Sequence, residues 1–332
     1  MGRIPAIDTL RVFAILAVLT LHARLFRAGE DLAGWERTAE IVLDHASRFA
    51  VPFFFFVVGF LFERGRGDTP PLDRAIPQVK RLLLLYFGWS LVLVGLEWVR
   101  RSVWAGGFAP VSWPDEATVK DTLSFGVRMH LWFLPALMQS LLVYAALAET
   151  RLIGPVAIAL YAVGLATGTY APVTGLDLGL WSRNGPFFGT LFVWAGAVSA
   201  RRAPPPLVAA FGMIVAGAAL HAAELVWLHE SHGQEWLHER INYLAGTALA
   251  GVGVGWLALA RPTLGARTVL PACGAYTLGV YILHLDVMQW LAETVPFTGI
   301  AGQMGLVLVT YAVTLGVVRV IAAWRGGRKW VG

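Results

Sequence analysis

Cysteine is almost absent from this chain, and charged residues are scarce. The single cysteine, Cys273, lies inside an apolar run, so no disulfide can form within the chain. Only 14% of the 332 residues are charged, whereas a soluble domain usually carries about 25%. With 57% hydrophobic residues and a mean hydropathy of +0.63, the chain has too few polar side chains to cover a water-facing surface. We therefore do not expect a soluble globular protein.

The motifs of several enzyme classes are also missing. The sequence contains no Gly-x-Ser-x-Gly, no Walker phosphate-binding loop, no His-Glu-x-x-His and no pair of cysteines. Serine hydrolase, nucleotide hydrolase and metal-thiolate chemistry are therefore without support. The net charge of +5 comes from basic residues between the apolar runs and not on one stripe, so we expect no nucleic-acid partner.

Long apolar runs recur along nearly the whole sequence. A run of about 20 residues spans the hydrocarbon core of a bilayer as a helix. Lipid offers no partners for backbone N–H and C=O groups, and these runs are too long and too continuously apolar for barrel strands. We therefore expect an all-α polytopic membrane protein with about ten transmembrane helices, forming a single domain over residues 1–332. The expected spans are residues 7–26, 40–62, 82–99, 130–148, 152–168, 185–200, 207–228, 241–260, 272–292 and 302–323.

An even number of crossings places both termini on one side of the membrane. Lys and Arg are more frequent in the segments that lie on that side, which favours a cytoplasmic location for both termini. The first apolar stretch has no convincing cleavage site and is interpreted as a membrane helix, not as a signal peptide. We expect an integral protein of a bacterial cytoplasmic membrane. Residues 30–50 carry apolar residues at helical spacing, which suits either an interfacial helix or an extended start of the second span.

The first span contains two ionisable side chains on one face. Arg11 and His22 are eleven positions apart, which places them within about 20° of each other around the helix and about 16 Å apart along its axis. Such groups are costly in a membrane helix and usually face a cavity. One groove could thus hold an anionic group at Arg11 and an activated hydroxyl at His22. The alternative is that Arg11 pairs with Asp8 while His22 is simply an interfacial residue, and the spacing alone leaves both open.

Here the sequence resembles the membrane-bound acyltransferase family 3 proteins. Their first helix carries an Arg or Lys and then a His at the spacing of Arg11 and His22, within a segment similar to IDTLRVFAILAVLTLH (residues 7–22). VPFFFFVVGFLF (residues 51–62) is similar to the family's Pro-aromatic-Gly second helix, although Val58 stands where many members have Ser or Thr. Three further segments resemble motifs of a subgroup that acylates surface polysaccharides: HLWFLPALM (130–138), RNGPFFGTLFVWAGA (183–197) and GVYILHL (279–285).

The resemblance implies transfer of an acetyl or other short acyl group to a hydroxyl of a glycan or glycolipid. It implies that His22 is the catalytic base, which agrees with the ability of a neutral imidazole to take the proton of an attacking hydroxyl. It also implies that Arg11 acts toward the acyl donor, as a fixed positive charge for a phosphate or carboxylate. No permanently bound cofactor is expected, since acyl-CoA, in particular acetyl-CoA, would be a donor substrate. The expected partners are this donor, the acceptor and membrane lipid, and the 36 glycines leave a homo-oligomer open.

Five further residues are candidate substrate contacts: His130, Trp132, Arg183, Asn184 and His284. A tryptophan with a nearby histidine suits sugar stacking and hydrogen bonding, but an interfacial anchor with a solvated histidine fits equally well. Arg183 and Asn184 could bind hydroxyls or a carboxylate of the acceptor, or Asn184 could cap the following helix. His284 and Asp286 are two positions apart and face different sides of a helix, which argues against a His–Asp dyad.

No metal site is expected. Glu224, His229, His232 and His238 lie close together in the sequence, but without a metalloprotease spacing, and solvated charges are the favoured interpretation. Two other functions stay open. A secondary transporter or exporter could use Arg11 and His22 to line its substrate path, although no paired broken segments mark an inverted repeat. A sensor or scaffold would need neither charge.

Overall fold

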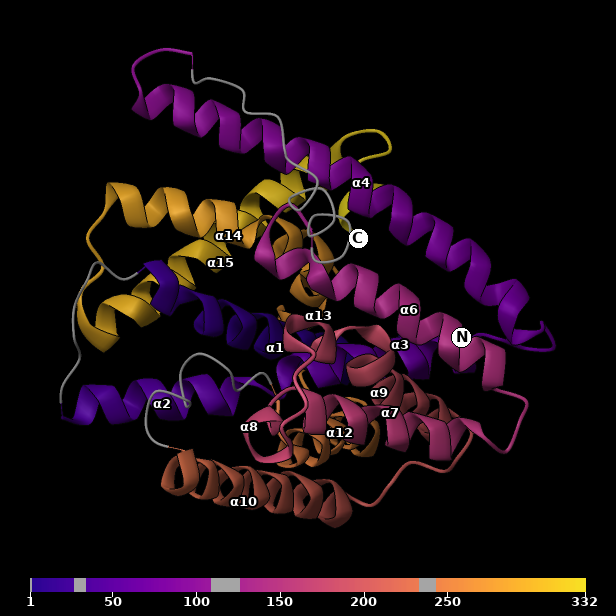
Figure 1. The fold of residues 1–332 in the computed structure, drawn as a ribbon. Coiled ribbons are helices and arrows are strands. Elements are labelled where there is room, and N and C mark those ends of the chain that lie inside the picture. The colour runs from indigo at the N-terminus through magenta and orange to yellow at the C-terminus, as the bar shows by residue number, and fades with distance from the viewer. Residues whose placement is uncertain (1, 27–33, 109–125, 233–242) are drawn as a thin grey trace.

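The computed structural model describes residues 2–26, 34–108, 126–232 and 243–332, and the regular elements within these ranges are helices (Figure 1). Those of the first half are α1 (Pro5–Ala23), η1 (Arg24–Phe26), α2 (Trp35–Ser47), α3 (Ala50–Arg64), α4 (Pro71–Trp104), η2 (Met129–Trp132), α6 (Phe133–Leu147) and α7 (Ile153–Thr167). Those of the second half are α8 (Ala171–Thr174), η3 (Gly179–Arg183), α9 (Gly185–Ala200), α10 (Leu207–His232), α12 (Ala245–Ala260), α13 (Leu270–Gly274), α14 (Thr277–Thr294), α15 (Gly299–Ala323) and α16 (Arg328–Val331).

The helices confirm the all-α membrane class and overlap every predicted span. Six helical segments of the described chain are long and apolar enough to cross a membrane: Pro5–Phe26, Trp35–Arg64, Pro71–Trp104, Met129–Leu147, Leu207–Ser231 and Gly299–Ala323. Two more, α7 and α12, are apolar but shorter. The total of about ten crossings therefore stays a prediction. The remaining helices are short or have polar residues near their middle.

Proline starts two of the long helices. Pro5 opens α1 and Pro71 opens α4, each at the first helical position, where the missing N–H removes no internal hydrogen bond. Gly65 follows α3 directly and ends it. The first span is thus a straight run that begins just before Asp8 and continues past His22.

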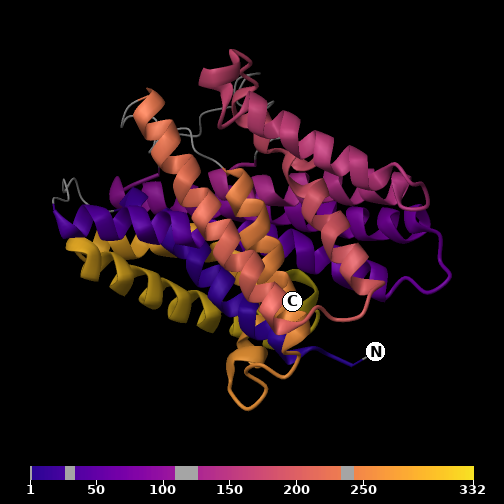
Figure 2. The same ribbon diagram turned by 90° about the horizontal axis from the view of Figure 1, so that it is seen from below.

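Helix α1 lies at the centre of the molecule. It contacts α14 and α15 on one side and α3 and α12 on the other, so that much of its surface is covered by protein (Figure 1). Helix α10 lies across the outer surface of α12, as the turned view shows (Figure 2). Because α1 is surrounded, its ionisable residues Asp8, Arg11 and His22 are buried or half-buried in protein.

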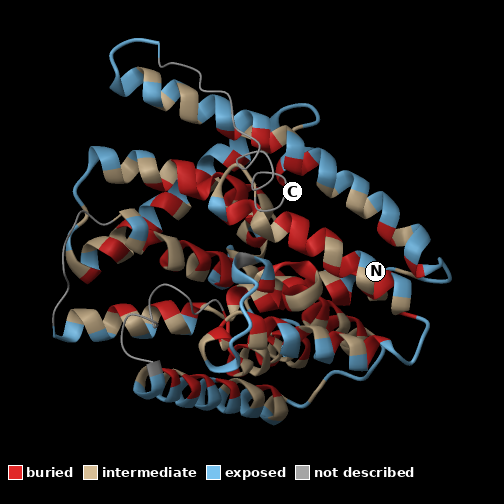
Figure 3. Ribbon diagram, in the orientation of Figure 1, coloured by how far each residue is buried: buried red, intermediate tan, exposed pale blue. Residues whose placement is uncertain are grey.

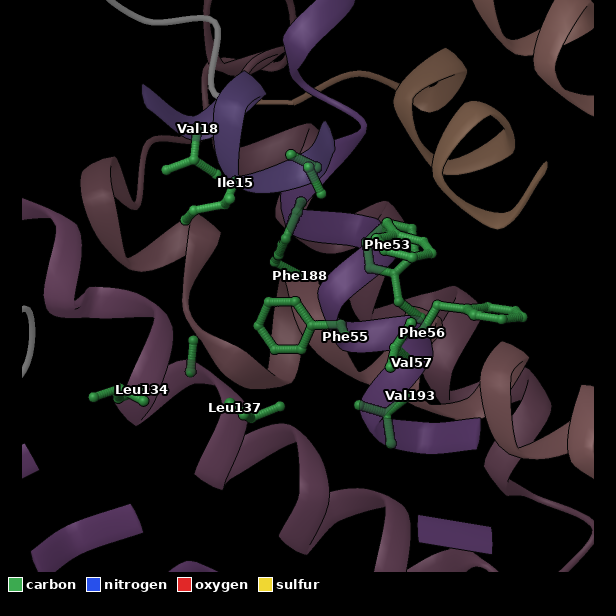
Figure 4. Packing of buried hydrophobic residues seen from close by; sticks show 14 of the residues in the cluster. Ile15, Val18, Phe53, Phe55, Phe56, Val57, Leu134, Leu137, Phe188 and Val193 are labelled. Atoms are coloured by element: carbon green, nitrogen blue, oxygen red, sulfur yellow. The ribbon is translucent and has the colours of Figure 1, made fainter. Parts of the chain in front are cut away.

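Helices α3 and α9 approach each other closely because each has a glycine at the crossing. A Cβ on Gly59 would overlap the backbone of Val193, and one on Gly196 would overlap the backbone of Phe56. Small residues of this kind allow close contact between membrane helices. Beside the crossing, Phe55 lies against Phe188 with ring centroids 5.7 Å apart (Figure 4).

The outer faces of the peripheral helices are apolar. Leu84 and Leu91 of α4 are 69% and 76% exposed, and Val208 of α10 is 79% exposed. Exposed positions line the outward sides of both helices (Figure 3). Apolar exposure on this scale is typical of a surface in contact with lipid and not with water.

Candidate functional site

A cavity of about 1090 Å³ lies beside α1 and is lined by Arg11 and His22. Arg11 lines it near the start of the helix and His22 near the end, so the cavity follows α1 over about 16 Å. Apolar side chains from α3 and α6 line the part between, among them Phe54, Val58 and Leu137. Val58, which stands where many proteins of the resembled family have a hydroxyl, thus gives this wall an apolar surface.

At the first end, Arg11 both pairs with Asp8 and lines the cavity, the two alternatives that the sequence left open. Its Nη1 donates to Asp8 Oδ1 over 3.0 Å, and the side chain, 24% exposed, also lines the cavity. Arg3 pairs with the same carboxylate, Nε to Oδ2 at 2.5 Å. Two guanidinium groups therefore share one carboxylate, and the end of the cavity keeps a positive charge. Arg81 adds a further guanidinium to this end.

At the other end, three histidine rings lie next to one another. The ring centroids of His22 and His284 are 5.3 Å apart, and those of His284 and His130 are 4.9 Å apart. Both His130 and His284 are fully enclosed by protein. The site therefore contains a row of imidazoles from α1, α14 and η2, of which only the first and last line the cavity.

Backbone carbonyl groups determine where the hydrogens lie on two of these rings. His130 Nε2 is 3.0 Å from Ile282 O, and His284 Nδ1 is 2.6 Å from Tyr281 O. A carbonyl oxygen only accepts, so these two nitrogens carry the hydrogens and donate. His130 Nδ1 and His284 Nε2 are then lone-pair acceptors, and both are buried without a hydrogen-bond partner in the described part of the chain.

Trp132 and Arg183 form the opposite wall at the His22 end. The Arg183 guanidinium lies over the Trp132 ring, 5.2 Å from its centroid, and both side chains line the cavity. Asn184, directly before α9, occupies the N-cap position without making a side-chain capping hydrogen bond, and its Nδ2 is buried without a partner in the described chain. Of the seven residues predicted as catalytic or substrate-binding, Asn184 and His284 do not line the cavity.

Helix α2 supplies site residues that the sequence reasoning missed. Asp44 and Arg48 line the cavity and pair with each other, Arg48 Nη2 to Asp44 Oδ2 at 2.7 Å, and Arg24 lies 3.9 Å from the same carboxylate. The polar side of α2 faces the protein, while Trp35 and Val42 on its apolar side are 70% and 58% exposed. The sequence held a signal, since the polar residues Glu40, Asp44 and Ser47 recur at helical spacing, and the structure buries all three.

The interpretation of Glu224 as a solvated charge was wrong. Its carboxylate is buried and accepts hydrogen bonds from the backbone N–H groups of Ala245 and Gly246, at 3.0 and 2.8 Å, at the start of α12. Tyr170 also donates to it, and burial together with this carboxylate raises the pKa of Tyr170. Glu224 thus caps a helix, which explains a charge at this depth. His238 of the same predicted cluster lies outside the described residues.

Comparison with known proteins gives one family and one curated relative. The model of the family described as "Acyltransferase domain" matches residues 4–324. The serine/alanine racemase of Enterococcus gallinarum is 24% identical over 241 residues, which cover 65% of this chain and 33% of that protein. The chain therefore spans about a third of that relative's length, and the likeness is too distant and too partial to carry the racemase activity over. No solved structure matches.

Proposed function

Because the chain belongs to this acyltransferase family, we propose that it is a membrane O-acyltransferase that moves a short acyl group from acyl-CoA to a hydroxyl of a glycan or glycolipid. The observation that carries the proposal is the single cavity that Arg11 and His22 both line. A donor with an anionic end and a thioester end fits such a cavity, since its phosphates would lie near Arg11 and its acyl carbon near His22. The acceptor hydroxyl enters at the His22 end.

In the transfer, the acceptor oxygen attacks the thioester carbonyl carbon while His22 takes the hydroxyl proton. The new C–O bond forms, the C–S bond breaks, and the proton passes from His22 to the departing thiolate. General base catalysis of this kind contributes about 10²–10⁴-fold to the rate. The neutral ring of His22 is required as the proton acceptor, and the net positive end at Arg11 holds the donor without taking part in proton transfer.

The neighbours of His22 divide into two groups. His130, Trp132 and Arg183 line the cavity and are placed to contact the acceptor, with the Trp132 face available to a sugar ring. His284 lies behind His22, and its Nε2 lone pair is available to accept an N–H from that ring. We assign His284 to positioning His22, in place of the substrate contact expected from the sequence.

Replacement of His22 by Ala tests the proposal. Protein reconstituted in vesicles would be supplied with acetyl-CoA and a lipid-linked glycan extract, and both thiol release and the mass of the acceptor would be measured. We expect His22→Ala to lower turnover about 10²–10⁴-fold, while His229→Ala, outside the cavity, keeps it. Undiminished acylation by folded His22→Ala protein would refute the role of His22. Passage of the acceptor across the vesicle without a mass change would favour a transporter.

A further inference from the structure

Arg183 is a guanidinium on the cavity wall without a carboxylate partner in the described chain. Its Nε is buried and lacks a hydrogen-bond acceptor there, and none of the ion pairs formed by the described residues includes it. What it does have is the face of Trp132 at 5.2 Å. A guanidinium stays charged at any physiological pH, so this charge cannot be removed by deprotonation.

Each of the other arginines of the cavity has an oxygen atom of the protein as a partner. Arg11 pairs with Asp8, and Arg24 and Arg48 both lie beside Asp44. Arg81 donates to the backbone oxygen of Gly332 over 3.1 Å. Burying a charge is costly unless an opposite charge or several hydrogen bonds compensate it, and an aromatic face compensates only in part. A ligand with a negative group is the compensation that the Arg183 position lacks.

The position of Arg183 indicates which substrate carries that group. Arg183 and His22 both line the cavity. Arg183 lies over Trp132, two residues after His130, and the ring of His130 belongs to the row that His284 continues to His22. The phosphates of the donor are assigned to the Arg11 end, about 16 Å away along α1, and the acyl carbonyl that reaches His22 is neutral. The unmatched charge therefore faces the acceptor.

We propose that the acceptor is an anionic sugar, whose carboxylate or phosphate binds Arg183 while the sugar ring lies on Trp132. The proposal rests on the proposed function and adds the class of acceptor to it. A planar guanidinium that stacks on an aromatic ring still offers its edge N–H groups to two oxygens of such an anion. The bound anion would hold a neighbouring hydroxyl of the same sugar toward His22.

Acceptors that differ only in charge provide the test. Methyl glucuronide, methyl glucoside 6-phosphate and methyl glucoside would be compared by acceptor KM and kcat with the reconstituted wild-type protein, Arg183→Gln and Arg183→Lys. The exposed Arg267→Gln variant is the control for loss of one positive charge. We expect Arg183→Gln to raise KM for the anionic acceptors about 10–100-fold and to raise KM for the neutral acceptor much less. Arg183→Lys should restore part of the loss. The anionic acceptor with the lower KM in the wild-type protein shows whether the site prefers a carboxylate or a phosphate.

A second measurement does not depend on turnover of these small acceptors. Diethyl pyrocarbonate modifies accessible histidines, and the modified fraction of His22 can be followed by mass spectrometry. The two anionic sugars should protect His22 at lower concentration than methyl glucoside in the wild-type protein, and this advantage should disappear in Arg183→Gln. The proposal is overturned if all three sugars protect His22 equally, or if none of them protects it. It is also overturned by an equal fall in kcat for charged and neutral acceptors at unchanged KM, which would place Arg183 at the reacting carbonyl.

Failure of the acceptor proposal and failure of the transferase proposal give different results. Thiol release from acetyl-CoA with water as the acceptor requires His22 but no sugar. If that release occurs in the wild-type protein and is lost in His22→Ala, while sugar charge has no effect, only the anionic acceptor is refuted. If no thioester is cleaved with any acceptor, the proposed function itself fails.

Discussion

The hydrogen on His284 decides what that ring can do for its neighbour. Because Nδ1 donates to the Tyr281 carbonyl, the other ring nitrogen, Nε2, is an acceptor, and it has no hydrogen-bond partner in the described part of the chain. In this orientation His284 can hold the N–H of His22 and leave the other nitrogen of His22 free to take a proton. An apolar side chain of equal size could not accept a hydrogen bond from His22 in this way.

Two substitutions at His284 separate positioning from packing. His284→Phe keeps the volume but removes the acceptor, and we expect kcat to fall about 10²-fold or more with little change in either KM. His284→Asn keeps an acceptor oxygen and should recover at least part of the rate. The kcat and KM values of both variants, in protein of equal thermal stability, would be compared. Equal activity of the Phe and Asn variants would contradict a positioning role.

Arg11 should act on donor binding. Replacement by Gln removes one of the two guanidinium groups that share Asp8, and we expect KM for acetyl-CoA to rise about 10–100-fold. Arg3→Gln is the matched control, since Arg3 pairs with the same carboxylate but does not line the cavity. A fall in kcat at unchanged donor KM would contradict the assignment.

The sequence was most informative where an ionisable residue interrupted an apolar helix. Arg11 and His22 could be placed on one face from their spacing alone, and the structure places both on the same cavity. Asp44 and Arg48 were missed because only the apolar residues of the segment 30–50 were considered, as the face of an interfacial helix or an extended start of the second span. In a membrane protein the polar side can face the protein and the apolar side the lipid, and α2 has this arrangement.

At the scale of the helices, the wall between the two ends of the cavity depends on how closely α3 and α9 cross. Gly196→Val would place a branched side chain against the backbone of Phe56, and we expect a loss of about 1–3 kcal/mol or more in stability. Gly212→Val is the control, because no atom lies within 4 Å of a Cβ there. The thermal unfolding midpoints of both variants would be measured in detergent. Equal midpoints would show that α3 and α9 can move apart without loss of stability.

The positions of the helices could be predicted from the sequence, but the number of crossings could not. Helix α9 has only 16 residues, and α14 contains His284 and Asp286 within its length. Asp286 is paired with Arg128 at 2.6 Å, a contact between residues 158 positions apart that no local pattern reveals. Tertiary partners of this kind allow polar residues inside a membrane helix, and they are outside the reach of hydropathy.

At the scale of the whole molecule, the proposed reaction needs a cavity that is open toward the two sides of the membrane. Arg11 and His22 lie near opposite ends of the same spanning helix, and the cavity that both line is also lined by Gln78 and Met129. A donor and an acceptor on different sides could then meet without either crossing the bilayer. This geometry accounts for an ionisable residue at each end of the cavity and an apolar part between them.

Cysteine labelling would test this arrangement. In a Cys273→Ser background, Gln78→Cys and Met129→Cys should react with a membrane-impermeant maleimide from opposite sides of oriented vesicles. Both residues line the cavity, Gln78 three residues before Arg81 and Met129 directly before His130. Acetyl-CoA should protect the cysteine at position 78 and leave that at 129 reactive, since its phosphates are assigned to the Arg11 end. Leu91→Cys, on the lipid-facing side of α4, is the control and should stay unlabelled. If both cavity positions were labelled from the same side, the cavity would open to only one side of the membrane. Donor and acceptor would then have to enter from that side.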